Sequence, residues 1–214
     1  MKISIIMPTF NRPQFINRAI NAILSQSYEN WELIIQNGGE SIKDIIPQDP
    51  RIKLFEEKDK GITDAMNKGM ARATGDIFNW HNDDDEVAPN TFKIVVDSIK
   101  DHKWLYGYIY MTNGSTGHYW GDKWQGLTRL VDGNHVPQPS VYWKRDLYEE
   151  VGGMDESEDL TSDYEYWLRF GSKYNPLFLD RIMAFYHLHD DQITNKQTAE
   201  QIAQAKRTAE KYVK

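Results

Sequence analysis

Residues 75–86 read Gly-Asp-Ile-Phe-Asn-Trp-His-Asn-Asp-Asp-Asp-Glu, and this stretch decides how the chain is interpreted. An apolar run at residues 77–80 leads directly to four consecutive acids at residues 83–86. Close carboxylates repel one another unless a positive charge lies between them, and a hard divalent cation commonly supplies that charge. The stretch therefore predicts a buried strand that ends at a Mg²⁺-type site. The alternative is a solvated turn before Pro89 that caps the next helix.

On both sides of this stretch, apolar residues follow two different periodicities. Continuous apolar runs predict buried strands, and apolar stripes with a spacing of three and four residues predict helices. The strands are expected at residues 2–7, 32–35, 52–55 and 77–80, and the helices at residues 15–24, 62–73 and 92–99. Such alternation indicates a parallel α/β sheet with helices on both faces, which binds ligands beyond the carboxyl ends of its strands. The loops at residues 8–12, 37–40 and 82–86 should therefore meet at one edge.

The second half of the chain has a less regular pattern. Residues 112–126 contain four glycines and two tryptophans, which predicts a long loop of the kind that is often functional. The expected strands are at residues 105–111, 141–143, 177–179 and 183–187, and the expected helices at residues 145–151, 164–170 and 198–213.

Length and composition limit the class of protein. A chain of 214 residues suits one domain, and the absence of cysteine from the sequence excludes a disulfide framework and a thiol nucleophile. The net charge of −7 argues against general binding to nucleic acid. The first apolar run ends at Pro8, and no apolar stretch reaches the roughly 20 residues that span a bilayer. We therefore expect a cytoplasmic protein with at most peripheral, transient membrane contact.

Four segments in a fixed order point to a known family. They read SIIMPTFNR at residues 4–12, DKGITDAMNKG at residues 59–69, ATGD at residues 73–76, and GGMDE at residues 152–156 followed by DYEYWLR at residues 163–169. Together they resemble the inverting GT-A glycosyltransferases of glycosyltransferase family 2. The resemblance implies one GT-A domain over residues 1–214, with a mostly parallel central sheet and helices on both faces. Residues 1–100 would bind the nucleotide sugar, residues 101–195 the acceptor, and residues 196–214 would form a C-terminal helix.

The resemblance also implies a reaction and a set of site residues. The reaction is metal-dependent transfer of a sugar, with inversion, from a nucleotide-diphosphate donor to a hydroxyl of a glycan or lipid-linked acceptor, as in polysaccharide or surface-glycan synthesis. Asp84 would bind Mn²⁺ or Mg²⁺, with Asp85 as an alternative ligand, and Asp83 would contact the nucleoside. His189 would approach the metal or the diphosphate. The other donor-binding positions are Pro8, Thr9, Phe10, Arg12, Asn37, Asp64 and Asn67.

The chain departs from the family pattern at two places. Asn82 stands where the acidic motif often begins with Asp, which leaves Asp84 as the main metal anchor. The loop after the second strand reads Gln-Asn-Gly-Gly at residues 36–39, where many relatives have two acids. Asn37 can still donate and accept hydrogen bonds to a nucleobase, although the same residues are ordinary turn formers. This departure weakens any inference that the nucleobase of the donor is uracil.

The acceptor side offers one candidate base and several candidate contacts. By the resemblance, Asp163 is the general base, and the alternative is an acid that merely favours the start of a helix. Glu165 is the second candidate for the base, and Gln138 is a candidate sugar contact. Trp120 and Trp124 either stack on a sugar or anchor the loop in the core.

Two other functions compete with glycosyl transfer. A nucleotidyltransferase of related fold would need a glycine-rich basic loop after the first strand, and residues 8–12 contain no glycine. A non-catalytic sugar-binding protein would not need both Asp84 and Asp163, and the chain has both.

Overall fold

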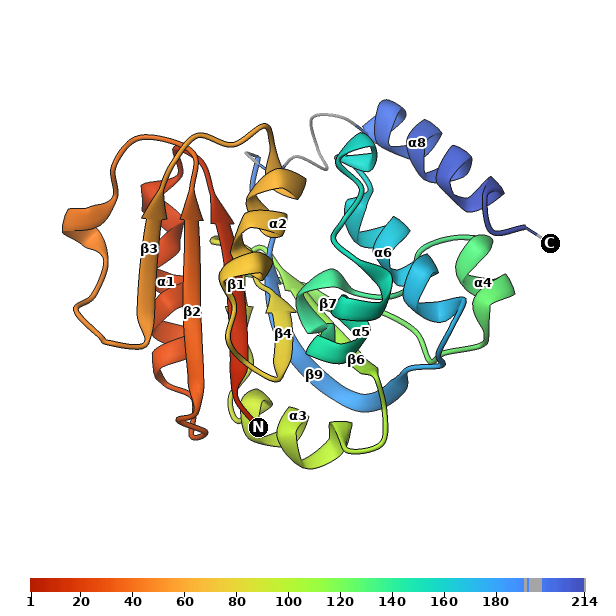
Figure 1. Cartoon of the computed structure of the whole chain (residues 1–214), viewed down its shortest axis with the longest axis horizontal. Coiled ribbons are helices and arrows are strands. Elements are labelled where there is room, and N and C mark those ends of the chain that lie inside the picture. The colour runs from red at the N-terminus through yellow and green to blue at the C-terminus, as the bar shows by residue number, and fades with distance from the viewer. Residues whose placement is uncertain (191, 193–197, 214) are drawn as a thin grey trace.

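The structure is a computed structural model that describes residues 1–190, 192 and 198–213. A nine-stranded sheet runs through this described part in the order β3-β2-β1-β4-β8-β6-β9-β5, with β7 paired to β6 outside that path. Helices lie on both sides of the sheet (Figure 1). This arrangement agrees with the α/β class that the alternating pattern predicts.

The first half of the sheet is parallel, and each face carries its own helices. The strands are β1 (Ile3–Thr9), β2 (Trp31–Asn37), β3 (Ile52–Glu56) and β4 (Ile77–Trp80). The helices are α1 (Pro13–Leu24), α2 (Ile62–Arg72) and α3 (Thr91–Ile99). Successive side chains of a strand point to opposite faces. Ile5 of β1 therefore packs in the core cluster that contains α1 and α3, while Ile6 packs in the cluster that contains α2.

The second half of the sheet mixes strand directions. Its strands are β5 (Glu86–Val87), β6 (Trp104–Thr112), β7 (Gly117–Trp120), β8 (Tyr142–Lys144) and β9 (Leu177–His187). β8 runs antiparallel to both β4 and β6, and β9 runs parallel to β6 but antiparallel to β5. The sheet is thus parallel from β3 to β4 and mixed beyond β4.

Short helices surround the mixed half of the sheet. They are α4 (Leu127–Val131), α5 (Arg145–Val151), α6 (Ser162–Gly171) and α8 (Thr198–Glu210), with 3₁₀ turns at Lys43–Ile45, Gln138–Ser140 and Glu156–Glu158. α6 is fixed to the sheet by aromatic packing, because Trp167 stacks on Trp104 of β6 with ring centroids 6.2 Å apart. The start of α6 therefore has a rigid position relative to the strand ends.

Polar contacts dock α8 beside α6 (Figure 1). The buried carboxylate of Glu158 accepts a hydrogen bond from Thr208 at 2.6 Å and pairs with Lys211 at 2.5 Å. The hydroxyl of Tyr212 donates to Glu165 at 3.0 Å. Across the described residues, none of the helices combines the length and the apolar character that a membrane crossing requires.

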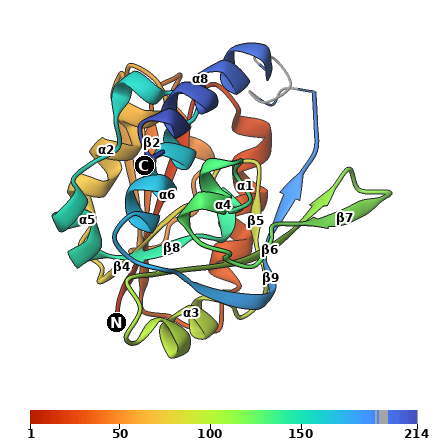
Figure 2. The same ribbon diagram turned by 90° about the vertical axis from the view of Figure 1, so that its right-hand side faces the viewer.

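Three features of the second half differ from the expectations. Residues 117–120 form β7, because the segment predicted as a loop folds back on β6 as a hairpin that projects from the body (Figure 2). The two short strands expected after residue 176 are one strand, β9, with an irregular register against β6. The last helix ends at Glu210 rather than at residue 213. The predicted boundary at residues 195 and 196 lies outside the described residues, and the division into two halves stays a prediction.

Candidate active site

Two adjoining cavities lie at the carboxyl ends of β1 and β4. The first, of about 510 Å³, is lined by Asp84 of the acidic cluster (residues 83–86), the start of α6 and the β6–β7 hairpin. The second, of about 530 Å³, is lined by the end of β1 with the loop after it and by residues 59–62 at the start of α2. Arg12, Ile62, Asp159 and Leu160 line both of them. The two cavities therefore share a wall.

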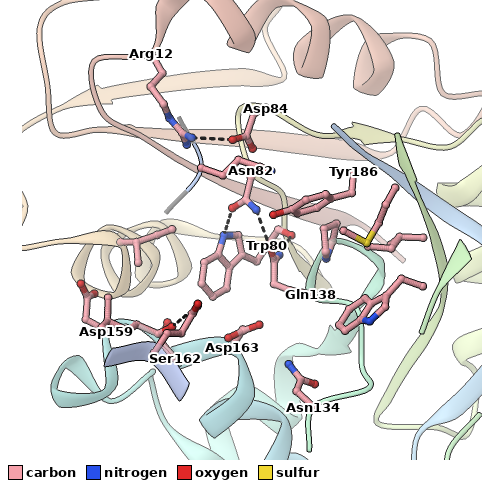
Figure 3. A pocket seen from close by; sticks show the side chains of 18 of the residues that line it. Arg12, Trp80, Asn82, Asp84, Asn134, Gln138, Asp159, Ser162, Asp163 and Tyr186 are labelled. Atoms are coloured by element: carbon pink, nitrogen blue, oxygen red, sulfur yellow. Dashed lines mark hydrogen bonds and ion pairs between the residues drawn. The ribbon is translucent and has the colours of Figure 1, made fainter. Parts of the chain in front are cut away.

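The acidic cluster is held by the loop that follows β1. Arg12 bridges two acids, with Nη2 at 2.5 Å from Asp83 Oδ1 and Nη1 at 2.7 Å from Asp84 Oδ2. Figure 3 shows the contact with Asp84. The hydroxyl of Thr9 donates to Asp83 Oδ2 at 2.6 Å. β1 and β4 are adjacent parallel strands, so their carboxyl ends bring these residues together across more than seventy positions of sequence.

Burial sets the protonation of the acids in this cluster. Burial raises the pKa of Asp83 to about 6, although the Arg12 guanidinium and the Thr9 hydroxyl oppose that rise. Burial and the neighbouring Asp84 carboxylate also hold the pKa of Asp85 well above its usual range. The side chain of Asp84 is only slightly exposed and borders the first cavity. Asp84 is therefore the acid of the cluster that is best placed to meet a ligand.

His189, the predicted late histidine, does reach the acidic cluster. Its Nε2 lies 3.1 Å from Asp84 Oδ2, and its ring stacks on Phe15 of α1 with centroids 4.4 Å apart. No group of three His, Cys, Asp or Glu side chains is arranged to enclose a metal ion within residues 1–190, 192 and 198–213. The protein thus offers two converging donors at this point, Asp84 and His189, rather than a closed metal cage.

Asp163 lies on the opposite side of the same cavity from Asp84 (Figure 3). It is half-buried in the first turn of α6, and burial raises its pKa to about 6 despite backbone N–H groups that stabilise its charge. The alternative base, Glu165, is buried elsewhere and pairs with Arg169 at 2.5 Å. Of the two acids, Asp163 is the one that borders the cavity.

Asn82 forms a hydrogen-bond link between β4 and the 3₁₀ turn at Gln138–Ser140. Asn82 Oδ1 accepts from Trp80 Nε1 at 2.8 Å, and Asn82 Nδ2 donates to Gln138 Oε1 at 2.9 Å. Gln138 Nε2 in turn donates to the Trp80 carbonyl at 2.6 Å. An ionised aspartate could accept from Trp80 but could not donate to Gln138. This network gives a physical reason for the departure from the family pattern.

The predicted donor-binding residues divide into two groups. Pro8, Thr9, Phe10 and Arg12 line the second cavity, and the Phe10 ring is 61% exposed there. The other group, whose side chains are engaged within the protein and line neither of these two cavities, consists of Asn37, Asp64, Asn67 and the fully buried Asp83.

The contacts of this second group tie the surrounding loops together. Asn37 donates to the Glu40 carbonyl at 2.7 Å, and Asp64 pairs with Lys68 at 2.9 Å. Asn67 exchanges hydrogen bonds with the backbone of Met154 at 2.8 and 2.9 Å. The donor-binding roles of Asn37, Asp64 and Asn67 stay predictions.

Asp159 lines both cavities although the sequence did not predict it as a site residue. Its carboxylate accepts a hydrogen bond from the Thr63 backbone N–H at 3.1 Å, across 96 positions of sequence. The sequence around Asp159 does not predict that this residue lines a cavity, because its position depends on that distant contact. The structure also separates the two tryptophans: Trp120 lines the first cavity, whereas Trp124 packs edge-on against Trp104 at 5.7 Å.

Comparison with known sequences assigns the chain to a family. The sequence profile described as Glycosyl transferase family 2 matches residues 4–150, which is more than half of the chain. The chain belongs to glycosyl transferase family 2. The predicted family, the enzyme class of glycosyltransferase and the GT-A fold class are confirmed at this level.

Several curated proteins are similar to this family 2 chain. An uncharacterized glycosyltransferase of Rickettsia typhi is 26% identical over 214 aligned residues, which cover 90% of this chain and 66% of that protein. A PGL/p-HBAD biosynthesis glycosyltransferase of Mycobacterium bovis is 27% identical over 191 residues, covering 84% of this chain and 73% of that protein. The chain spans just under two thirds of the Rickettsia typhi protein and 35% of an uncharacterized glycosyltransferase of Rickettsia conorii.

Solved structures share the fold at low sequence identity. S. aureus TarS 1–349 in complex with UDP-GlcNAc has a TM-score of 0.75 at 17% identity, covering 90% of this chain and 60% of that chain. Mannosyltransferase PcManGT from Pyrobaculum calidifontis, in complex with GDP-Man and Mn²⁺, has a TM-score of 0.69 at 16% identity and covers all of this chain and 65% of that chain. Such likeness establishes the fold of the family 2 chain and leaves its substrates to be inferred from its own site.

Proposed function

We propose that this chain is a metal-dependent, inverting glycosyltransferase that uses a nucleoside-diphosphate sugar as donor and a hydroxyl of a glycan or lipid-linked molecule as acceptor. One observation carries the proposal. Asp163 and Asp84 line opposite sides of one cavity, and that cavity adjoins a second one that is lined by the loop after β1. A base on one side and a leaving-group site on the other are what a single displacement at an anomeric carbon needs.

The donor nucleotide is assigned to the second cavity. The exposed face of Phe10 suits stacking on a nucleobase, and Thr9, which lines the same cavity, donates to the buried Asp83 behind it. TarS and PcManGT in complexes with UDP-GlcNAc and GDP-Man support a nucleotide sugar without choosing between the two bases.

The donor set at the acidic cluster fits a shared divalent cation. Mg²⁺ is usually held by one or two carboxylates and completes its shell with water and substrate phosphates. Asp84 and His189 would hold Mn²⁺ or Mg²⁺ in this way, and Asp85 is the alternative ligand although burial favours its neutral form. When bound, the cation supplies charge stabilisation to the departing diphosphate.

Asp163 is the proposed general base. Its carboxylate takes the proton of the acceptor hydroxyl as that oxygen bonds to the anomeric carbon. The bond between the anomeric carbon and the diphosphate oxygen breaks in the same displacement, and its electron pair leaves with the diphosphate. Attack from the side opposite to the leaving group inverts the anomeric configuration.

The acceptor sugar is assigned to the part of the first cavity between α6 and the β6–β7 hairpin. Trp120 is 36% exposed there and offers a flat apolar face to the C–H groups of a pyranose. Asn134 and Ser162, which also line this cavity, supply polar groups for hydroxyls. An apolar wall opposite polar side chains is typical of sites that bind sugars, which have both kinds of surface.

A donor screen tests the proposal. The purified protein is incubated with UDP-glucose, UDP-GlcNAc, UDP-galactose or GDP-mannose, with Mn²⁺ and a mixture of simple glycosides, and release of nucleoside diphosphate is measured. We expect release from one donor, dependence on the cation, and a product of inverted anomeric configuration. A retained configuration, or activity that is undiminished in excess EDTA, would contradict the corresponding part of the proposal.

A further inference from the structure

Arg12 already pairs with the Asp84 carboxylate, whose negative charge the proposed cation would neutralise. Its guanidinium is largely buried and forms ion pairs with Asp83 at 2.5 Å and with Asp84 at 2.7 Å. The Asp84 oxygen in that pair, Oδ2, is the same atom that lies 3.1 Å from His189 Nε2. The best-placed ligand atom of the acidic cluster is therefore already shared by two side chains of the protein.

The backbone before Arg12 directs it into this position. Asn11 has a φ of +53°, a left-handed conformation that asparagine adopts more readily than most residues other than glycine. Its side-chain oxygen accepts a hydrogen bond from the Glu40 backbone N–H at 2.8 Å, which holds the turn in place. Pro13 then starts α1 immediately after Arg12. The backbone of Arg12 is thus held between a fixed turn and the first turn of α1.

We propose that Arg12 is a displaceable counter-charge that keeps the divalent cation away from Asp84 until a nucleoside diphosphate is bound. This inference rests on the donor and the cation of the proposed function. A guanidinium paired with Asp84 and a divalent cation compete for that carboxylate, because two positive centres so close together repel strongly in a partly buried site. Arg12 in its observed position therefore weakens cation binding at Asp84.

The position of Arg12 between the two cavities leaves space for its side chain after it releases Asp84. Arg12 lines both cavities, so its guanidinium can turn from the acids toward the nucleotide in the second cavity without leaving the protein. A planar guanidinium binds phosphate oxygens in a bidentate manner and also stacks on aromatic rings. The nucleotide and the cation would then favour each other's binding, and the coupling must be equal in both directions.

The test measures Mn²⁺ binding directly, without a sugar donor. Wild-type protein, Arg12→Met and Arg18→Met are titrated with Mn²⁺ alone, and free Mn²⁺ is followed by electron paramagnetic resonance. Arg18 is the matched control, because it also lies at the cluster but donates to the Asp84 carbonyl at 2.7 Å and pairs with Glu86 at 3.4 Å. Both variants lose one positive charge, and only Arg12→Met frees the Asp84 carboxylate.

We expect Arg12→Met to bind Mn²⁺ at least about tenfold more tightly than wild type and than Arg18→Met, because a competing cation has left the ligand atom. Arg12→Lys, which keeps a charge but not the bidentate fork, should lie between them. Circular dichroism confirms that each variant is folded. Equal Mn²⁺ affinity of Arg12→Met and Arg18→Met would overturn the inference.

A second titration separates this inference from the proposed function. Wild-type protein is titrated with Mn²⁺ in the presence of saturating UDP or GDP. Tight Mn²⁺ binding in that arm, together with no gain in Arg12→Met, would reject the role of Arg12 and leave the metal-dependent function standing. Failure of every protein to bind Mn²⁺, with or without nucleotide, would reject both.

Discussion

The two cavities of this protein are built in different ways. The second cavity, proposed to bind the donor and named the donor-side cavity, is lined almost entirely by two short stretches, residues 8–12 and 59–65, with Asp159 and Leu160 from far along the described chain. The first cavity, proposed to bind the acceptor and named the acceptor-side cavity, draws on strands, turns and helices from Arg12 to Gln201. The donor-side cavity therefore depends mainly on the β1 and α2 loops, while the acceptor-side cavity depends on how the second half packs. Variants of the second half should change acceptor use and transfer while leaving nucleotide binding intact.

Asp84→Ala should have the largest effect, because Asp84 borders the first cavity and the proposed cation serves both cavities. We expect Mn²⁺-dependent transfer to fall by at least about 10³-fold, since a cation on the leaving diphosphate is worth several kcal/mol. The fold should persist, because Asp84 lies outside both core clusters. Transfer assays with and without EDTA, beside a thermal melt of each protein, make the measurement. Full activity of Asp84→Ala would remove the metal role.

Asp163→Asn should separate the two cavities most clearly. The substitution keeps the size of the side chain but removes its ability to accept a proton, which typically lowers the rate by about 10²–10⁴-fold. Nucleotide affinity should not change, because Asp163 does not line the donor-side cavity. Transfer rate and nucleotide binding are measured on the same preparation, the second by calorimetry. A wild-type transfer rate in this variant would refute the assignment of the base.

The first half of the chain could be predicted from the sequence because its strands and helices have clear apolar periodicity and its strands end at one edge of a parallel sheet. Apolar runs and stripes predict β1, β2, β4 and their helices, and adjacent parallel strands bring the acidic cluster to the loop after β1. The resemblance predicts His189 near the metal or the diphosphate and Asp163 as the general base. The structure brings Asp163 to the first cavity and His189 to Asp84, which lines that cavity. The roles of both residues stay predictions.

The acceptor half could not be predicted in the same way, because its features depend on long-range packing. β7 has four exposed residues and therefore shows no apolar periodicity, so only its pairing with β6 defines it as a strand. β9 reads as two strands because Asp180 and Arg181 are exposed in its middle. Asp159 depends on a contact 96 positions away. No local pattern encodes these placements.

Trp120→Ala tests whether the hairpin contributes to acceptor binding. We expect the KM for a saccharide acceptor to rise about tenfold, because aromatic stacking contributes roughly 1 kcal/mol beyond area burial. Tyr119 is the matched control: it is the neighbouring residue on β7, is 65% exposed, and packs against Tyr110 instead of lining the cavity. Steady-state kinetics on both variants, with donor KM as a second readout, decide the point. Equal effects of Trp120→Ala and Tyr119→Ala would mean that the hairpin is not an acceptor wall.

The pH dependence of transfer should give the smallest and most diagnostic effect. Burial raises the pKa of Asp163 to about 6, and the base must be ionised to accept a proton. Activity should therefore be constant above pH 7, fall to about half at pH 6, and fall about tenfold by pH 5. Asp83, on the donor side, has a similarly raised pKa of about 6, so nucleotide affinity is measured over the same range. A decline in kcat that is absent from the residual activity of Asp163→Asn belongs to Asp163. A decline that persists in Asp163→Asn and follows nucleotide affinity would show that the titrating group is not Asp163. Asp83 would then be the candidate.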